Sequence, residues 1–243
     1  MDKTYTERID IYSDEQPNDS QQLNTILTKI YSTIREEATK LGWDYTLQIN
    51  FIHHQPINNA FYAKIYASSD VKDTPYTPVI ANITERNQPH KTHTQILKHQ
   101  YPVVACGGTF DHMHDGHKIL ISMAAFLTHK TLIVGITGPK LLQNKKYAEV
   151  LELFEQRKAN VENFANLIIG TRNIDINVYE INDVCGPTGF ISEIDALVVS
   201  EETVKGADFI NNYRKEKNFP PLEVVVIDVI GDEESGSHNG WAG

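Results

Sequence analysis

Residues 103–117 read Val-Val-Ala-Cys-Gly-Gly-Thr-Phe-Asp-His-Met-His-Asp-Gly-His, and this stretch predicts the fold of the second half of the chain. The first four residues are an apolar run typical of a buried strand. Gly107 and Gly108 allow a tight turn and a close approach to a bound group, because neither has a Cβ atom. The next helix is expected to begin near Gly116 or His117. A strand, a glycine turn and a helix in this order predict the start of a parallel α/β unit.

The alternation of strands and helices continues through the rest of the chain. Further strands are expected at residues 131–136, 176–181, 196–199 and 223–229. Further helices are expected at residues 150–167 and 203–217. Apolar strands that alternate with helices indicate a parallel sheet with helices on both faces. We therefore predict a Rossmann-like α/β domain over residues 101–243, whose ligands bind beyond the carboxyl ends of the strands.

The first hundred residues follow a different pattern. Apolar residues recur at helical spacing from residue 23 to residue 41, with Asp19 or Ser20 as the N-cap and Gly42 as the stop. Short alternating strands are expected at residues 45–51, 61–65 and 79–81, and a polar connection at residues 84–100. These residues predict a small α+β domain over residues 1–100. It carries no motif, and its role as a docking surface, a regulatory lid or a stabilising cap is left open.

Composition narrows the class of protein. The 243 residues are 40% hydrophobic and 22% charged, as in ordinary soluble globular proteins. A net charge of −10 argues against a broad nucleic-acid surface, which needs clustered Lys and Arg. Apolar runs of membrane-spanning length and the apolar core of a signal peptide are missing from the sequence. Cys106 and Cys185 do not suggest a disulfide framework, so a cytoplasmic or nucleocytoplasmic protein is expected.

The start of the helix after the glycine turn is where an anion is expected to bind. A helix N-terminus presents unpaired N–H groups and the positive end of the helix dipole, which together stabilise phosphate. His114 and His117 are three positions apart, so both can lie on one face and reach that site. Imidazole N–H groups can donate to phosphate oxygens.

The segment Gly-Gly-Thr-Phe-Asp, followed by His114-Asp115-Gly116-His117, resembles the HxGH signature of the nucleotidyltransferase superfamily. Within it, the chain resembles the eukaryotic-type phosphopantetheine adenylyltransferases. The passages that carry this resemblance are the HxGH segment with Lys118, then Asn144-Lys145-Lys146, Gly186-Pro187-Thr188, and Val198-Val199-Ser200-Glu201-Glu202-Thr203 with Gly206, Asn211 and Arg214. A kinase phosphate-binding loop does not occur in the sequence, so the resemblance is to the monofunctional, fungal-like form.

The resemblance implies an activity. Members of the family join ATP and 4′-phosphopantetheine to give dephospho-CoA and pyrophosphate, with Mg²⁺ held on the triphosphate largely by phosphate oxygens and water. A dedicated carboxylate cage for a metal is not visible in the sequence. The implied partners are these two substrates and, beside them, separate enzymes of the coenzyme A pathway. Two alternatives stay open: an HxGH transferase with another acceptor, and a catalytically impaired nucleotide-binding or scaffold paralogue.

The resemblance also implies the site. His117 and His114 would contact the ATP phosphates, and Lys145 would bridge the two phosphate groups, with Lys146 or Lys140 as alternatives. The other implied nucleotide- and acceptor-binding residues are Gly107, Gly108, Thr109, Phe110, Asp111, Gly116, Ser200, Glu201, Thr203, Asn211 and Arg214.

Several of these residues also have a plain structural interpretation. Ser200 and Glu201 can be an N-cap with a capping carboxylate, because a helix is expected just after them. The three lysines can lie in a solvated loop, and Arg214 can be a surface residue.

The C-terminal residues differ from the family pattern. Relatives continue into a Ser/Thr-rich turn and an arginine on the next helix, which together hold the β- and γ-phosphates. Here residues 231–243 read Gly-Asp-Glu-Glu-Ser-Gly-Ser-His-Asn-Gly-Trp-Ala-Gly. We therefore expect that the chain folds and keeps the acceptor site but binds ATP weakly. Its turnover is expected to be slower by roughly a hundredfold or more if one phosphate clamp is lost.

Overall fold

The computed structural model describes residues 8–12, 17–43, 47–52, 62–66, 101–142 and 151–228. The expected strand at residues 79–81, the polar connection at residues 84–100, Lys145, Lys146 and residues 231–243 lie outside these ranges. The expected domain boundary near residue 100 therefore stays a prediction.

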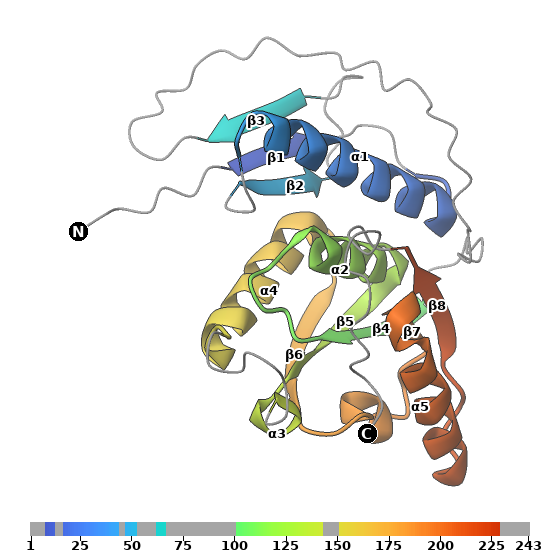
Figure 1. The fold of residues 1–243 in the computed structure, drawn as a ribbon. Helices are drawn as coiled ribbons and strands as arrows, with labels where there is room; N and C mark the ends of the chain where they lie inside the picture. Colours follow the sequence, from blue (N-terminus) through green and yellow to red (C-terminus); the bar gives the residue numbers. More distant parts are fainter. Residues whose placement is uncertain are drawn as a thin grey trace.

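The second half of the chain is a parallel five-stranded sheet, as expected (Figure 1). Its strands are β4 (Tyr101–Gly108), β5 (Thr128–Thr137), β6 (Asp175–Ile181), β7 (Ala196–Ser200) and β8 (Glu223–Ile227). The order across the sheet is β6-β5-β4-β7-β8, and every neighbouring pair is parallel. The chain first builds from β4 toward β6 and then returns to the other side of β4. The topological switch point therefore lies at the carboxyl end of β4, where such sheets bind ligands.

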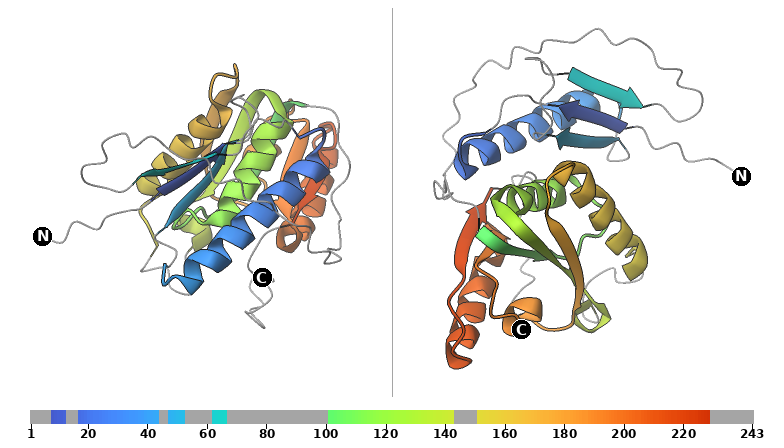
Figure 2. Two further views of the ribbon diagram at one scale, coloured as in Figure 1. Left: turned by 90° about the horizontal axis from the view of Figure 1, so that it is seen from above. Right: turned by 180° about the vertical axis from the view of Figure 1, so that it is seen from behind.

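Helices cover both faces of this sheet (Figures 1 and 2). The long helices are α2 (Asp115–Leu127), α4 (Phe154–Ile169) and α5 (Val204–Glu216). Val104 and Cys106 of β4 belong to the buried cluster that contains α2 and α4, whereas Ala105 belongs to the cluster of α5. Successive strand residues thus point to opposite faces, and each face has its own apolar core. This confirms the Rossmann-like α/β prediction.

The N-terminal half forms a second, smaller sheet with one helix. Its elements are β1 (Arg8–Tyr12), α1 (Ser20–Lys40), β2 (Gln48–Ile52) and β3 (Tyr62–Tyr66). The strand order is β2-β1-β3, with β1 parallel to β2 and antiparallel to β3. Asp19 caps α1 by accepting from the Gln22 N–H at 2.8 Å, and Gly42 follows it with a φ of 81°, as the sequence predicted. Strand β1 was not predicted.

The two halves share one hydrophobic core. Leu23, Leu27 and Tyr31 of α1 belong to the same buried cluster as Ile119 and Ile121 of α2. Figure 1 and the right-hand view of Figure 2 both show α1 lying across α2. Among the described residues, none of the helices has the length and apolarity that a membrane span requires.

Candidate active site at the carboxyl edge of the sheet

Three neighbouring strands end beside one another and bring most of the predicted site residues to one edge. β4 ends at Gly108, β5 ends at Thr137 just before the short helix α3 (Pro139–Leu142), and β7 ends at Ser200. Because β5, β4 and β7 are adjacent and parallel, their carboxyl ends lie on the same side of the sheet. The glycine segment, Lys140 and the Ser200 segment are therefore gathered at the switch point.

The two glycines do not form the turn that was expected of them. Gly107 and Gly108 are the last residues of β4 and pair with Gly135 and Ile136 of β5. The backbone instead takes left-handed φ values at Phe110 (53°) and His112 (44°). For non-glycine residues this conformation costs about 1–3 kcal/mol and persists only where the surroundings enforce it. The turn after β4 is therefore held by its side-chain contacts, and the glycines keep the strand end free of Cβ atoms.

The two signature histidines meet at the start of α2. Helix α2 begins at Asp115, so His114 is its N-cap residue and His117 lies in its first turn, with Gly116 buried between them. The imidazole rings of His114 and His117 are stacked with their centroids 3.7 Å apart. The buried ring of Phe110 lies against His117 at 5.1 Å. The expectation that both histidines share one face of the helix is confirmed.

The environment favours the neutral form of His114. Neighbouring protein atoms remove part of the solvation of its ring, and this desolvation lowers its pKa below the usual value. Lys118 lowers the pKa further, whereas Asp115 and Asp111 oppose the change. A neutral imidazole at a helix N-terminus can still donate one N–H to a phosphate oxygen.

A buried arginine that sequence reasoning missed holds the turn after β4. Arg157 of α4 is 2% exposed, and its Nη1 donates to the carbonyl oxygens of Thr109 at 2.7 Å and Thr137 at 2.9 Å. Its Nε donates to the carbonyl oxygen of Glu152 at 3.1 Å. One guanidinium therefore ties the ends of β4 and β5 to the start of α4. The sequence could have indicated that Arg157 is buried, because it lies four residues before Val161 and therefore on the same, buried face of α4.

Asp111 takes part in a second set of hydrogen bonds that holds the same turn. Its Oδ1 accepts from the Glu152 backbone N–H at 2.8 Å, while the His112 N–H donates to Glu152 Oε2 at 2.8 Å. These reciprocal bonds enforce the left-handed residue His112. Asp111 therefore has an evident role in shaping the turn, and its expected contact with a substrate stays a prediction.

The segment after β7 is not the expected capping box. Glu201–Thr203 form a 3₁₀ turn, η3, before α5 begins at Val204. The Thr203 hydroxyl donates to the Ser200 carbonyl oxygen at 3.1 Å and lies 3.3 Å from the Ser200 hydroxyl. Neither Ser200 nor Thr203 makes a side-chain cap bond to the helix backbone. Ser200, Glu201 and Thr203 thus stand at the edge of the sheet beside β4.

Arg214 is a buried structural residue, which corrects its interpretation as a surface residue. Its side chain is fully buried. It donates to five backbone carbonyl oxygens, those of Thr188, Ile191, Ser192, Ile194 and Pro220, at 2.7–3.2 Å. The 3₁₀ turn η2 (Gly186–Gly189), which lies in the connection from β6 to β7, is thereby fixed to α5.

Asn211, one turn before Arg214, is also engaged with backbone. Its amide exchanges two hydrogen bonds with the backbone of Leu222, at 3.0 and 2.8 Å. Asn211 and Arg214 therefore hold the loops that precede β7 and β8. Their expected contact with nucleotide stays a prediction.

Comparison with known proteins shows the family of this chain. A profile of the family described as cytidylyltransferase-like matches residues 105–238. The phosphopantetheine adenylyltransferase of Saccharomyces cerevisiae is 35% identical over 232 residues, which cover 91% of this chain and 74% of that protein. The chain belongs to the phosphopantetheine adenylyltransferase family. The phosphopantetheine adenylyltransferase of Pyrococcus abyssi is 37% identical over 57% of this chain and 88% of its own length. An uncharacterised protein of Schizosaccharomyces pombe is 42% identical over 53% of this chain and 40% of its own length.

The relatives differ in how much of this chain they cover. The yeast adenylyltransferase aligns with 91% of the chain and therefore reaches into the N-terminal half. The archaeal adenylyltransferase aligns with 57%, about the share taken by the five-stranded domain. Sequence similarity to the yeast relative thus extends into the N-terminal half.

Proposed function

We propose that the chain transfers the adenylyl group of ATP to 4′-phosphopantetheine, giving dephospho-CoA and pyrophosphate, a step of coenzyme A biosynthesis. The observation that carries the proposal is the stacked His114–His117 pair at the N-terminus of α2, beside the glycine end of the central strand. This pair occurs in a chain that is 35% identical to a yeast enzyme of that name over 91% of its length.

The proposed reaction is a single in-line displacement. A 4′-phosphate oxygen of the acceptor attacks the α-phosphorus of ATP in line, a new P–O bond forms, and the bond from the α-phosphorus to the bridging oxygen breaks. Pyrophosphate leaves with the bonding electron pair, and no covalent protein intermediate is needed. Catalysis then consists of aligning two anions and stabilising charge on the α and bridging oxygens.

The described residues supply donors for that charge. The first turn of α2 presents backbone N–H groups and the positive end of the helix dipole. His114 and His117 add imidazole donors on the same face. Thr109 lies on the turn held by Arg157 and is our candidate for contact with the acceptor phosphate.

The lysine that bridges the two phosphate groups is part of the proposal. Lys145 is the first candidate, with Lys146 and Lys140 as alternatives. Lys140 is exposed on α3, at the carboxyl end of β5 and therefore at the correct edge of the sheet. Lysine suits this position because its ammonium is a compact charge on a flexible stem.

Mg²⁺ is expected to enter with ATP. Within the described ranges, clusters of three or more His, Cys, Asp or Glu side chains that could hold a metal are not found. The ion would therefore be held by phosphate oxygens and water, with the chain contributing its fixed donors. It would neutralise part of the triphosphate charge. We also propose a cytoplasmic or nucleocytoplasmic location and association with other enzymes of the pathway, which imaging and co-purification of a tagged chain would test.

The decisive experiment is a pyrophosphate-release assay with the full chain, ATP, Mg²⁺ and 4′-phosphopantetheine. The proposal expects pyrophosphate and dephospho-CoA in equal amounts. Pantetheine without its phosphate is the matched control and should give neither product. Product with CTP but not ATP, or ATP binding without pyrophosphate release, would contradict the proposal and favour another transferase or a non-catalytic nucleotide-binding protein.

A further inference from the structure

The helix that carries the signature histidines is also the one on which the N-terminal half docks. Asp115 and Lys118 of α2 are three positions apart and turn toward α1 and β2, on a face adjacent to that of His114 and His117. Both side chains are charged, and both residues are buried, at 6% and 2% exposed. Buried charges of this kind are costly unless they are paired and hydrogen-bonded.

The N-terminal half supplies those partners. Arg35 of α1 forms a two-pronged ion pair with Asp115, in which Nε and Nη2 each donate to one carboxylate oxygen at 2.9 Å. Nη2 also donates to the carbonyl oxygen of Leu47 at 3.1 Å. Lys118 Nζ donates to the carbonyl oxygen of Ile49 at 2.7 Å and to Gln48 Oε1 at 3.0 Å. The first turns of α2 are therefore held by α1 and β2 directly.

The Arg35–Asp115 pair has an electrostatic consequence for the site. Asp115 lies in the first turn of α2, where a carboxylate interacts favourably with the helix dipole and so competes with a bound anion. Its charge also acts on His114, whose pKa it raises against the larger lowering by desolvation. An uncompensated carboxylate at this position would repel a triphosphate placed at the helix N-terminus. Arg35 provides the opposite charge at hydrogen-bond distance.

We propose that Arg35 is a positioning residue for ATP: by neutralising and orienting Asp115 it preserves the affinity of the α2 N-terminus for polyphosphate, so the N-terminal half is part of the active-site framework. This inference rests on the proposed function. It assigns the N-terminal half a task that the five-stranded domain does not perform for itself, because the guanidinium comes from α1.

The test compares Arg35→Met, Asp115→Asn and the double variant in the full chain. Lys40→Met is the matched control, since Lys40 lies on the same helix but pairs with Glu36 and Glu37. The readouts are Mg·ATP affinity by calorimetry, the pKa of His114 by NMR titration, and the thermal midpoint. Arg35→Met should weaken Mg·ATP binding about tenfold, the change that ~1.4 kcal/mol of repulsion produces, and should raise the pKa of His114.

Reversal by the second change is the decisive result. Asp115→Asn in the Arg35→Met background should bring Mg·ATP affinity back to within about twofold of the wild type, because the repelling charge is removed. A folded double variant that still binds Mg·ATP tenfold more weakly, or an Arg35→Met protein that binds it like Lys40→Met, would overturn the inference. If Arg35→Met does not fold, a folded double variant that binds Mg·ATP tenfold more weakly than the wild type still overturns the inference. Calorimetry needs no turnover, so a wild-type chain that releases no pyrophosphate would refute the proposed function and leave this comparison decisive.

Discussion

The imidazole rings of His114 and His117 lie face to face, 3.7 Å apart between centroids, at the first turn of α2. Two stacked imidazolium ions would repel each other, and the lowered pKa of His114 keeps that ring neutral over a wider pH range. His114 is thus arranged to offer a directed N–H donor to a phosphate beside the ring of His117.

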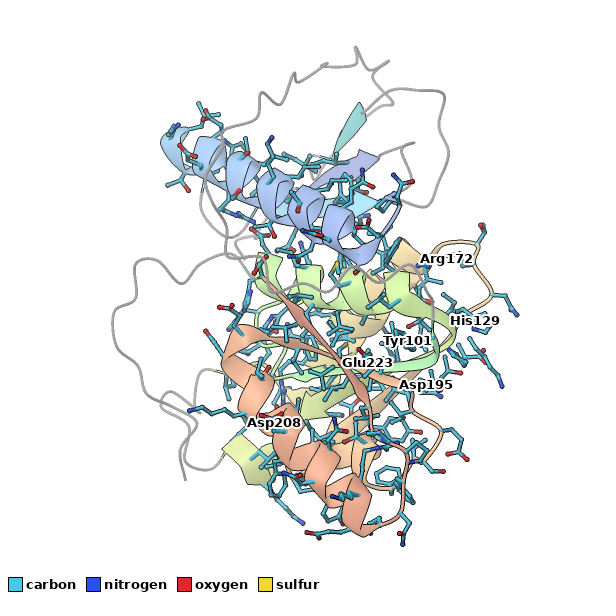
Figure 3. All side chains as sticks on the ribbon, turned by 90° about the vertical axis from the view of Figure 1, so that its right-hand side faces the viewer. Tyr101, His129, Arg172, Asp195, Asp208 and Glu223 are labelled. Carbon is cyan, nitrogen blue, oxygen red and sulfur yellow. The ribbon has the colours of Figure 1, made fainter. Side chains whose placement is uncertain are left out.

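Replacing His117 with alanine should therefore reduce kcat far more than acceptor affinity, because its contacts strengthen as charge develops in the transition state. The expected loss is roughly 10²–10³-fold, or about 3–4 kcal/mol. Steady-state kinetics with ATP and 4′-phosphopantetheine measures it. His129→Ala is the control, since this exposed residue is the second of β5 and lies at the opposite, amino edge of the sheet (Figure 3). An unchanged kcat in the His117 variant would remove this residue from the mechanism.

Arg157→Lys should lower kcat/KM by roughly tenfold to a hundredfold, because an ammonium cannot reproduce the guanidinium bonds to Thr109, Thr137 and Glu152 that fix the turn after β4. Arg172→Lys is a matched change. Arg172 also donates to backbone carbonyl oxygens, those of Ala125 and Ile169, but lies just before the start of β6, at the amino edge of the sheet (labelled in Figure 3). If both variants lose activity equally, the loss reflects general destabilisation, and the positioning role of Arg157 is wrong.

Arg214→Met should destabilise the fold by about 3 kcal/mol or more, because five backbone carbonyl oxygens lose their donor. Urea unfolding compares this variant with Lys215→Met, an exposed neighbour on the same helix. Well below the unfolding midpoint, the KM for ATP should stay within about twofold of the wild type. A large rise in the KM for ATP with intact stability would instead restore Arg214 to the nucleotide pocket.

Lys118 should make the stability of the folded protein depend on pH, whereas a methionine at this position should not. Burial lowers its pKa from 10.5 to about 8 in the folded protein. Between these two values the unfolded chain binds more protons than the folded chain, so the wild type should gain stability over Lys118→Met as the pH rises from 8 to 10.5. Thermal midpoints at pH 7, 8.5 and 10 measure this difference. Lys130→Met changes an exposed position of β5, and its thermal midpoint should differ from that of the wild type by the same amount at every pH. If the difference in thermal midpoint between the wild type and Lys118→Met is also the same at every pH, burial does not lower the pKa of Lys118.

The sequence was a good guide where structure follows from local pattern. The strand before Gly107, the alternation of helices and strands, and the cap at Asp19 all depend on residues within a few positions of one another. The shared face of His114 and His117 depends only on helical spacing. These features could be predicted because their physical causes are contained in short windows of sequence.

Features that depend on distant partners escaped prediction. Strand β1 contains Arg8 and Asp10, which suggest an exposed segment, yet Asp10 is buried because Arg8 and Asn50 donate to it at 2.6–2.7 Å. Arg157 has partners on β4 and β5, far away in sequence. Arg214 could be interpreted as a surface residue, yet it is buried against loops that only the tertiary fold brings together.

The core that joins α1 to α2 also sets an order of events while the chain is being synthesised. The apolar stripe of α1, with Leu23 and Leu27, emerges from the ribosome before any of α2 has been made. At about 5–20 residues per second, several seconds pass before Ile119 and Ile121 can cover it. Every nascent copy therefore carries an uncovered helix face through that interval. A delay in translation between Lys40 and Asp115 would lengthen the time in which this face can bind a chaperone or another nascent chain.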